Sequence, residues 1–184
     1  NLTTSKIKTL SNDTTPNILW SKVKNAQAYE IFIARDAGFS QIVFIKTVNT
    51  TDITIEPPLA DGIYFVQVRA YNSELNPGKF SKSFSFTIDT TPPPAPTSLS
   101  PDYNSNVTSR PTLQWTTNIG DVTYEIQVDN NADFSTLEFT STTKNKSIRT
   151  NTLAKNTTYY WRVRVNDKAG NWSNWSVVFS FFVP

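Results

Sequence analysis

The chain of 184 residues contains no cysteine and no histidine. Without cysteine it has no disulfide framework and no thiolate metal site. Without histidine it lacks the usual general base, the usual metal ligand, and every nucleophile that depends on a Ser-His or Cys-His pair. Because these groups carry most enzyme chemistry, we expect no catalytic residues, no metal and no cofactor.

Long apolar runs and a strong charge of one sign are missing as well. No apolar run approaches the roughly 18 residues that would span a bilayer, and no charged-apolar-small leader opens the sequence. Lys+Arg 17 against Asp+Glu 15 gives a net charge of +2, whereas nucleic-acid binding needs a clustered basic face. We therefore expect no nucleic acid as a partner and no membrane insertion in this fragment, which we take to be excised from a longer protein.

The clearest structural signal is the alternation in residues 159–166. Apolar side chains occupy every second position, which is the period of a strand with one buried and one solvent-facing side. The predicted core side is Tyr159, Trp161, Val163 and Val165, and the solvent side is Tyr160, Arg162, Arg164 and Asn166. Residues 64–72 form a cruder copy of this strand.

An internal repeat with a spacing of 95 residues runs through the chain. Such duplication has to be recognised before a fold is assigned. The spacing pairs Trp20 with Trp115, Tyr29 with Tyr124, Glu30 with Glu125, Ile31 with Ile126, Phe39 with Phe134, Ser40 with Ser135, Tyr64 with Tyr159, Arg69 with Arg164, Phe84 with Phe179 and Phe86 with Phe181. The repeat unit has the size of a small sandwich domain.

Each repeat contains short strand signals separated by turn residues, without helical periodicity. The expected strands are 7–10, 17–21, 27–34, 41–47, 51–56, 62–72 and 79–88, then 111–116, 122–129, 136–141, 146–150, 157–166 and 174–183. This pattern predicts an all-β protein of two tandem seven-stranded antiparallel β-sandwiches. We place the domains at 1–91 and 92–184, joined by a semi-rigid proline-rich linker at about 89–96.

The order of aromatic residues resembles the fibronectin type III pattern over nearly the whole chain. That pattern has Trp on the second strand, Tyr on the third, Leu before the long strand and Tyr near its start. These are Trp20, Tyr29, Leu59 and Tyr64, then Trp115, Tyr124, Leu153 and Tyr159. The resemblance implies structural roles for Trp20, Trp115, Tyr64 and Tyr159, with the hydroxyls of the two tyrosines bonded to nearby backbone. The alternative is a core tyrosine without that bond.

Several short sequence segments are similar to those of immunoglobulin-like or fibronectin-like modules of bacterial and archaeal surface proteins. They are Tyr-Glu-Ile-Gln-Val at 124–128, Asp-Phe-Ser at 133–135, Asp-Lys-Ala-Gly-Asn-Trp-Ser at 167–173 and the linker Asp-Thr-Thr-Pro-Pro. In that group such modules are spacers, adhesive stalks or accessories to secreted enzymes. The resemblance implies an extracellular or cell-surface location, with neighbouring modules of the parent protein as partners.

Residues 172–176 read Trp-Ser-Asn-Trp-Ser, which is similar to the WSXWS box of class I cytokine receptors. The resemblance implies that Trp172 and Trp175 stack with Arg162 and Arg164 by cation–π attraction. Simple alternation would put Trp175 on the core face, so the ladder requires a bulge. The alternatives are an exposed platform for a polysaccharide or protein, and ordinary packing.

A true cytokine-receptor-like ectodomain is a remote alternative. The first repeat has Phe80-Ser81 where the second has Trp175-Ser176, and it lacks the cysteine pairs of a receptor.

Other polar clusters give weaker signals. Asp129, Asn131 and Asp133 alternate like a calcium loop but lack its central Gly and downstream acid, so we interpret them as a turn. Asp89 and Asp167 could share a calcium ion, which we do not predict. The carboxylate pairs Asp121 with Glu125 and Glu30 with Asp36 have no cleft to act in. Asn-X-Ser/Thr sequences begin at Asn1, Asn12, Asn49, Asn106, Asn145, Asn156, Asn171 and Asn174. Their excess over chance mildly favours an exported, glycosylated protein, and compositional coincidence is an equal alternative.

The sequence therefore predicts a non-catalytic extracellular structural or adhesive module. It would act as a spacer or presenting unit within a larger secreted or cell-surface protein. The alternative is a carbohydrate- or protein-binding module that uses exposed Trp172 and Trp175.

Overall fold

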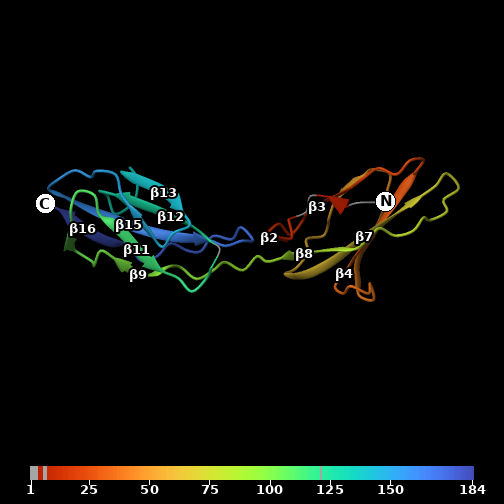
Figure 1. The fold of residues 1–184 in the computed structure, drawn as a ribbon, viewed down its shortest axis with the longest axis horizontal. Coiled ribbons are helices and arrows are strands. Elements are labelled where there is room, and N and C mark those ends of the chain that lie inside the picture. The colour runs from red at the N-terminus through yellow and green to blue at the C-terminus, as the bar shows by residue number, and fades with distance from the viewer. Residues whose placement is uncertain (1–3, 6–7, 121) are drawn as a thin grey trace. The chain divides into compact units, whose positions relative to one another are not determined.

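A computed structural model describes residues 4–5, 8–120 and 122–184. Over these residues the protein is all-β and contains no helix, as predicted (Figure 1). Contacts divide the chain into two compact units, Asn1–Thr90 and Thr91–Pro184. Each unit is a sandwich of one small and one larger sheet, and the two are described separately.

The described residues of the first unit form eight assigned strands in two sheets. Strands β1 (Thr4–Ser5), β3 (Asn17–Trp20) and β6 (Asp52–Thr54) form one sheet in the order β1-β3-β6. The other has the order β2-β8-β7-β4-β5, built from β2 (Leu10–Ser11), β4 (Ala28–Ala34), β5 (Ile42–Val48), β7 (Gly62–Tyr71) and β8 (Phe84–Ile88).

The second unit repeats this topology. Its small sheet has the order β14-β11-β9, from β9 (Thr97–Ser100), β11 (Thr112–Thr116) and β14 (Ser147–Arg149). Its larger sheet has the order β10-β16-β15-β12-β13, from β10 (Ser105–Asn106), β12 (Thr123–Asp129), β13 (Phe139–Thr143), β15 (Thr157–Asn166) and β16 (Phe179–Val183).

Seven strands become eight assigned segments because the first strand of each unit is divided in two. Its first half joins the small sheet, while its second half pairs in parallel with the last strand, as β2 with β8 and β10 with β16. The sandwich is therefore antiparallel except at these two edges. Our expected first strand began at Ile7, which lies outside the described residues, and the structure has β2 at Leu10–Ser11 instead.

The side chains of the long strands face as the alternation predicted. In β15, Tyr159, Trp161, Val163 and Val165 are all 2% exposed or less, while the residues between them are partly exposed. Each such burial stabilises the fold by about 1.5–3 kcal/mol. The cores are separate clusters, one containing Trp20 and Tyr64 and the other containing Trp115 and Tyr159.

The predicted last strands, 79–88 and 174–183, are wrong in their first halves. Strands β8 and β16 begin only at Phe84 and Phe179. Before β16, Ser173 and Ser176 donate their backbone N–H groups to Val165 and Val163 at 2.8 Å. From Ser173 to Ser176 the segment advances three residues while its partners on β15 advance two, from Val165 to Val163. In a regular strand pair both strands advance by the same number of residues.

The first unit has the same irregular segment. Gly78 donates its N–H to the Ala70 carbonyl at 2.7 Å, and Ser81 donates to Val68 at 2.8 Å. These positions are those of Ser173 and Ser176 in the 95-residue repeat. The backbone pattern is thus shared by both units, although the Trp-Ser sequence occurs only in the second.

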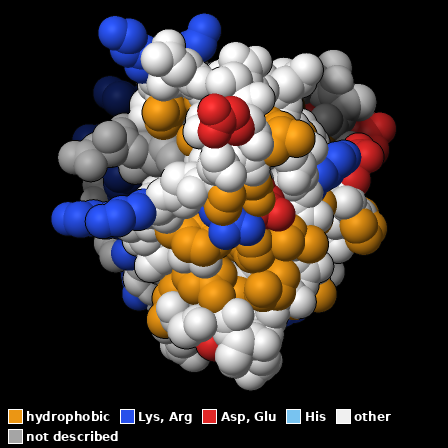
Figure 2. Space-filling model, turned by 90° about the vertical axis from the view of Figure 1, so that its right-hand side faces the viewer, with side chains coloured by type: hydrophobic (Ala, Val, Ile, Leu, Met, Phe, Trp, Pro, Cys, Tyr) orange, Lys and Arg blue, Asp and Glu red, His pale blue; other side chains and the backbone are white. Residues whose placement is uncertain are grey.

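The edge strand β5 carries an apolar outer side. Val43 and Ile45 are 48% and 53% exposed, and Ile45 lies opposite Phe32 of β4. Hydrophobic side chains gather, with basic atoms among them, on the side of the first unit drawn in Figure 2. The repeat-equivalent residues Glu138, Thr140 and Gln127 are polar. Lys46 is the one charged residue of β5. Alternation puts it on the inner side of the strand with the half-buried Phe44 and Val48, and its own side chain is exposed at the sheet edge.

Candidate functional site: a tryptophan–arginine ladder

The structure brings Arg162, Arg164, Trp172 and Trp175 together on the outer side of the larger sheet of the second unit. Strand β15 presents both arginines to this side because its other side forms the core. The segment after Trp172 passes three residues for every two of β15. Residues 172 and 175 therefore lie on the same side, next to the two arginines.

The four side chains alternate ring and guanidinium. The Cζ atom of Arg164 lies 4.4 Å from the ring centroid of Trp172 and 4.6 Å from that of Trp175. The Cζ atom of Arg162 lies 4.5 Å from the ring centroid of Trp175. All three distances are within the range of cation–π attraction. We call this stack, with Phe134 described next, the ladder.

Phe134 adds a ring that the sequence analysis did not assign to the site. Its centroid lies 4.0 Å from Cζ of Arg162, on a loop between β12 and β13. Phe134 has a φ of 59°, in the left-handed region that bulky residues rarely adopt. Phe39, its repeat equivalent, has a φ of 56°. The pairing of these two phenylalanines in the repeat was the available signal, but it gave no reason to place them beside an arginine.

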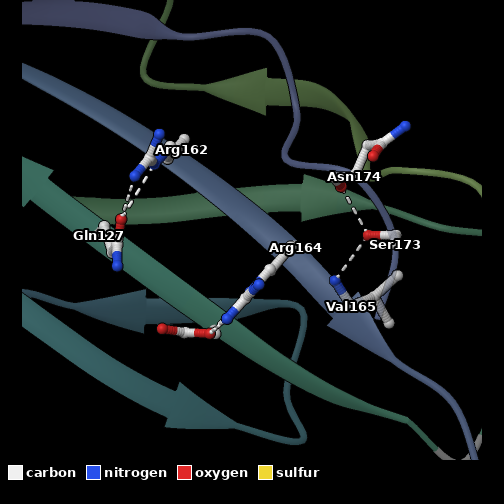
Figure 3. A network of polar contacts seen from close by, with 7 residues as sticks. Gln127, Arg162, Arg164, Val165, Ser173 and Asn174 are labelled. Carbon is white, nitrogen blue, oxygen red and sulfur yellow. Dashed lines mark hydrogen bonds and ion pairs between the residues drawn. The ribbon is translucent and has the colours of Figure 1, made fainter. Parts of the chain in front are cut away.

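Both arginines are also fixed by polar side chains of β12 (Figure 3). Arg162 donates two hydrogen bonds to Oε1 of Gln127, at 3.0 and 2.7 Å. Arg164 Nη2 forms an ion pair with Glu125 Oε2 at 2.6 Å. Arg164 Nε donates a hydrogen bond to the same oxygen at 2.7 Å. Burial, and then the positive charge of Arg164, lowers the pKa of Arg162. The Arg162 guanidinium still stays charged at neutral pH, because guanidinium groups lose their proton only at a far higher pH.

The two serines of the box hold the segment to β15. Ser173 Oγ accepts the N–H of Val165 at 3.0 Å and donates to the Asn174 carbonyl at 2.7 Å (Figure 3). Ser176 Oγ accepts the N–H of Val163 at 3.1 Å and donates to the Val177 carbonyl at 2.9 Å. Both serines are buried. Their hydroxyls satisfy strand N–H groups that the three-for-two spacing leaves without a carbonyl partner.

The first unit has a smaller version of the ladder around Arg69. Its Cζ atom lies 4.8 Å from the ring centroid of Phe80, and 5.5 Å from those of Phe32 and Tyr71. Glu30 pairs with it at 2.6 Å, as Glu125 pairs with Arg164. The equivalent of Arg162 is Gln67, so the stack of the first unit has one cation where that of the second has two.

The predicted structural residues lie in the cores. Trp20 and Trp115 are 4% and 2% exposed. The Tyr64 hydroxyl donates to the Ala60 carbonyl at 2.7 Å, and the Tyr159 hydroxyl accepts the Ala154 N–H at 2.9 Å. Each tyrosine thus bonds to the backbone just before its own strand.

The weaker clusters are local turns. The Asp129 carboxylate accepts the N–H groups of Asn131 and Thr136 at 3.0 and 2.8 Å. Asp167 accepts those of Gly170 and Asn171, each at 2.8 Å. Within the described residues, no group of three or more His, Cys, Asp or Glu is placed to hold a metal.

The carboxylate pairs also have other partners. Glu30 is bonded to Arg69, and Asp36 accepts the N–H groups of Ser40 and Gln41. Asp121 lies outside the described residues. No helix in the described part of the chain is long and apolar enough to cross a membrane.

Comparisons with known proteins agree on the fold. A family model described as the Rha78A-like, N-terminal immunoglobulin domain matches residues 105–183. Chicken CNTN1 FN1-FN3 domains are similar in structure, with a TM-score of 0.58 and 19% identity, over 92% of this chain and 62% of that one. The Clostridium thermocellum CbhA fibronectin(III)-like modules give a TM-score of 0.60 and 14% identity, over 100% of this chain and 94% of theirs.

The chain thus has the fibronectin type III fold, and it spans 62% of the CNTN1 structure's length. No curated protein matches the sequence.

Proposed function

We propose that the chain is a non-catalytic structural module, acting as a spacer or presenting unit in a larger secreted or cell-surface protein. The observation that supports this most is that both arginines of the ladder already have stacking and hydrogen-bond partners within the chain. Both guanidinium groups lie between or against rings, and both are hydrogen-bonded to β12. A side chain held on all these sides contributes rigidity, whereas catalysis or capture of a ligand needs a group that is available.

The likeness in fold supports the same proposal. The matching family is described as an immunoglobulin domain, and the similar structures are fibronectin type III modules. Such domains often occur in extracellular proteins, and the Asn-X-Ser/Thr sequences suit an exported chain. Fold alone does not define a function, so the proposal depends on the mechanical behaviour of the chain.

Force spectroscopy on the full chain tests the proposal. We expect two separate unfolding events, each releasing roughly 300 Å of chain, the extended length of one 90-residue unit. The double variant Arg162→Lys with Arg164→Lys should lower the force of one event and leave the other unchanged. Extension without distinct force peaks would overturn the spacer role.

Binding by the outer end of the ladder is the second candidate function. Trp172 is 38% exposed, and it is the terminal ring of the stack. A glycan array probed with the chain and with Trp172→Ala tests this. Loss of a wild-type signal in the variant would establish Trp172 as a binding residue. Absence of any signal, together with rings shielded from acrylamide, would leave the structural role.

A further inference from the structure

Strand β5 forms a free edge of the larger sheet of the first unit. Among the described strands it pairs with β4 alone, and the sheet ends there in the order β2-β8-β7-β4-β5. An edge strand offers a row of unpaired N–H and C=O groups along its outer flank. β5 is seven residues long, and its register with β4 is regular from Phe44 to Val48. It contains no proline, so the backbone donors of this row are all present.

The outer side of the sheet is apolar at this edge. Val43 and Ile45 are exposed there. Ile45 lies opposite Phe32 of β4, and the Phe32 ring packs edge-on against the exposed Phe80 ring with 5.1 Å between the centroids. These side chains form an apolar strip that begins at the free edge and continues across β4. A strand added to the edge would extend this strip with its own outward-facing side chains.

Lys46 gives the same edge a positive charge without a counter-charge. Its side chain is exposed, and among the described residues it takes part in no hydrogen bond and no ion pair. β5 itself contains no acid. The acids of β4 and β6, which precede and follow β5 in the chain, are Glu30 and Asp52, and they are bonded to Arg69 and Asn17 instead. The edge therefore favours a partner that brings a carboxylate.

The equivalent edge of the second unit lacks these features. Strand β13 is only five residues long. The 95-residue spacing aligns Val43, Ile45 and Lys46 with Glu138, Thr140 and Ser141. Next to β13, Asn151 Nδ2 donates to the Glu138 carbonyl at 3.3 Å, so one backbone acceptor at this edge is already bonded. Two copies of one scaffold thus differ at the same edge, one long, apolar and basic, the other short and polar.

We propose that β5 binds an extended, acidic peptide segment of a partner protein as an added strand. Main-chain hydrogen bonds to a free edge supply affinity in this mode, and alternate side chains supply specificity. Val43 and Ile45 select apolar side chains on the outer side, and Lys46 selects a Glu or Asp opposite it on the inner side. A second copy of the chain is disfavoured, because its β5 has no acid to offer Lys46.

Fluorescence anisotropy of the full chain with a labelled peptide tests the proposal. The probe is Thr-Thr-Glu-Ile-Thr-Val-Thr, which in antiparallel pairing places Glu opposite Lys46 and the two apolar residues opposite Ile45 and Val43. We expect this peptide to bind more tightly than the same peptide with Gln or Lys in place of Glu. Lys46→Gln should weaken its binding about two- to fivefold, the contribution of one exposed ion pair. Lys46→Glu should reverse the preference in favour of the lysine peptide.

N-methylation of the peptide tests whether it binds as a strand, because it removes backbone donors without altering the protein. In a paired strand, alternate residues direct their N–H groups to opposite flanks. Methylation of one alternate set should therefore abolish binding, and methylation of the other set should leave it unchanged. Bound peptide should also slow amide hydrogen exchange in β5 and leave exchange in β13 unchanged.

The matched control is Lys82→Gln, which removes an exposed lysine before β8 of the same unit and should leave binding unchanged. Equal affinity for the three peptides, an unchanged preference in Lys46→Glu, equal binding of both methylated peptides, or no binding at all would each overturn the proposal. A dimer in sedimentation, with β5 protected from exchange before peptide is added, would assign the edge to a second copy and overturn it as well.

Discussion

Arg162 stands between the Trp175 and Phe134 rings and makes two bonds to Gln127. Lysine keeps the charge but loses the planar surface and the two parallel donors. We therefore expect Arg162→Lys to lower the free energy of unfolding of the second unit by about 1–2 kcal/mol, counting about 0.5–1 for each ring. Urea unfolding followed by tryptophan fluorescence measures this change.

Arg149→Lys is the control, because Arg149 is exposed and makes one 3.4 Å bond to the Arg110 carbonyl. It should change stability by less than the ladder variant. Equal effects of the two substitutions would mean that stacking contributes nothing measurable.

Asp129 links stability to pH. Burial on its own would raise its pKa, but hydrogen bonds from Asn131 and Thr136 outweigh burial and lower it below the ordinary value of 3.8. A lowered pKa stabilises the fold fully above pH 3.8, and this contribution is lost as pH falls through the folded-state value. Asp129→Asn should therefore flatten the acid side of the stability curve. Urea unfolding of both proteins from pH 6 down to pH 2 checks this, and parallel curves would contradict it.

At the scale of elements, the segment between β15 and β16 depends on the two serine hydroxyls. Ser176→Ala leaves the buried N–H of Val163 without its acceptor. We expect a loss of about 1–3 kcal/mol, the cost of an unsatisfied buried donor. Amide hydrogen exchange should become faster at Val163. The matched variant Ser81→Ala should instead affect Val68, whose N–H is bonded to Ser81 Oγ at 3.1 Å.

The predictability of the elements follows from their periods. Most strands and the two sides of β15 could be predicted because a strand repeats every two residues. Strands β9 and β10 were missed, since each is too short to show that period. The irregular backbone before β8 and β16 could not be predicted, because it depends on which carbonyl of β7 or of β15, respectively, each N–H group reaches. The ladder arginines were predicted from a resemblance, while Phe134 was not, because its place depends on a loop turn.

At the scale of the whole molecule, the two cores are separate clusters with no shared residue. Ile31 and Ile126 occupy equivalent positions in them, and both are 0% exposed. Ile31→Ala should destabilise only the first unit and Ile126→Ala only the second, each by about 2–5 kcal/mol. Calorimetry of the full chain should resolve two transitions, of which each variant shifts one. A joint shift of both would show that the units unfold together.

Lys46 has a consequence for how the chain behaves in concentrated solution. Residues 42–48 read Ile-Val-Phe-Ile-Lys-Thr-Val, a β-prone window at a sheet edge whose single charge is this lysine. Inward-pointing charges at edges hinder the addition of further strands. Acetylation of Lys46, or Lys46→Val, would turn the window into a neutral template of the kind that nucleates amyloid fibrils. We therefore expect one ammonium group to be the main obstacle to strand addition at this edge.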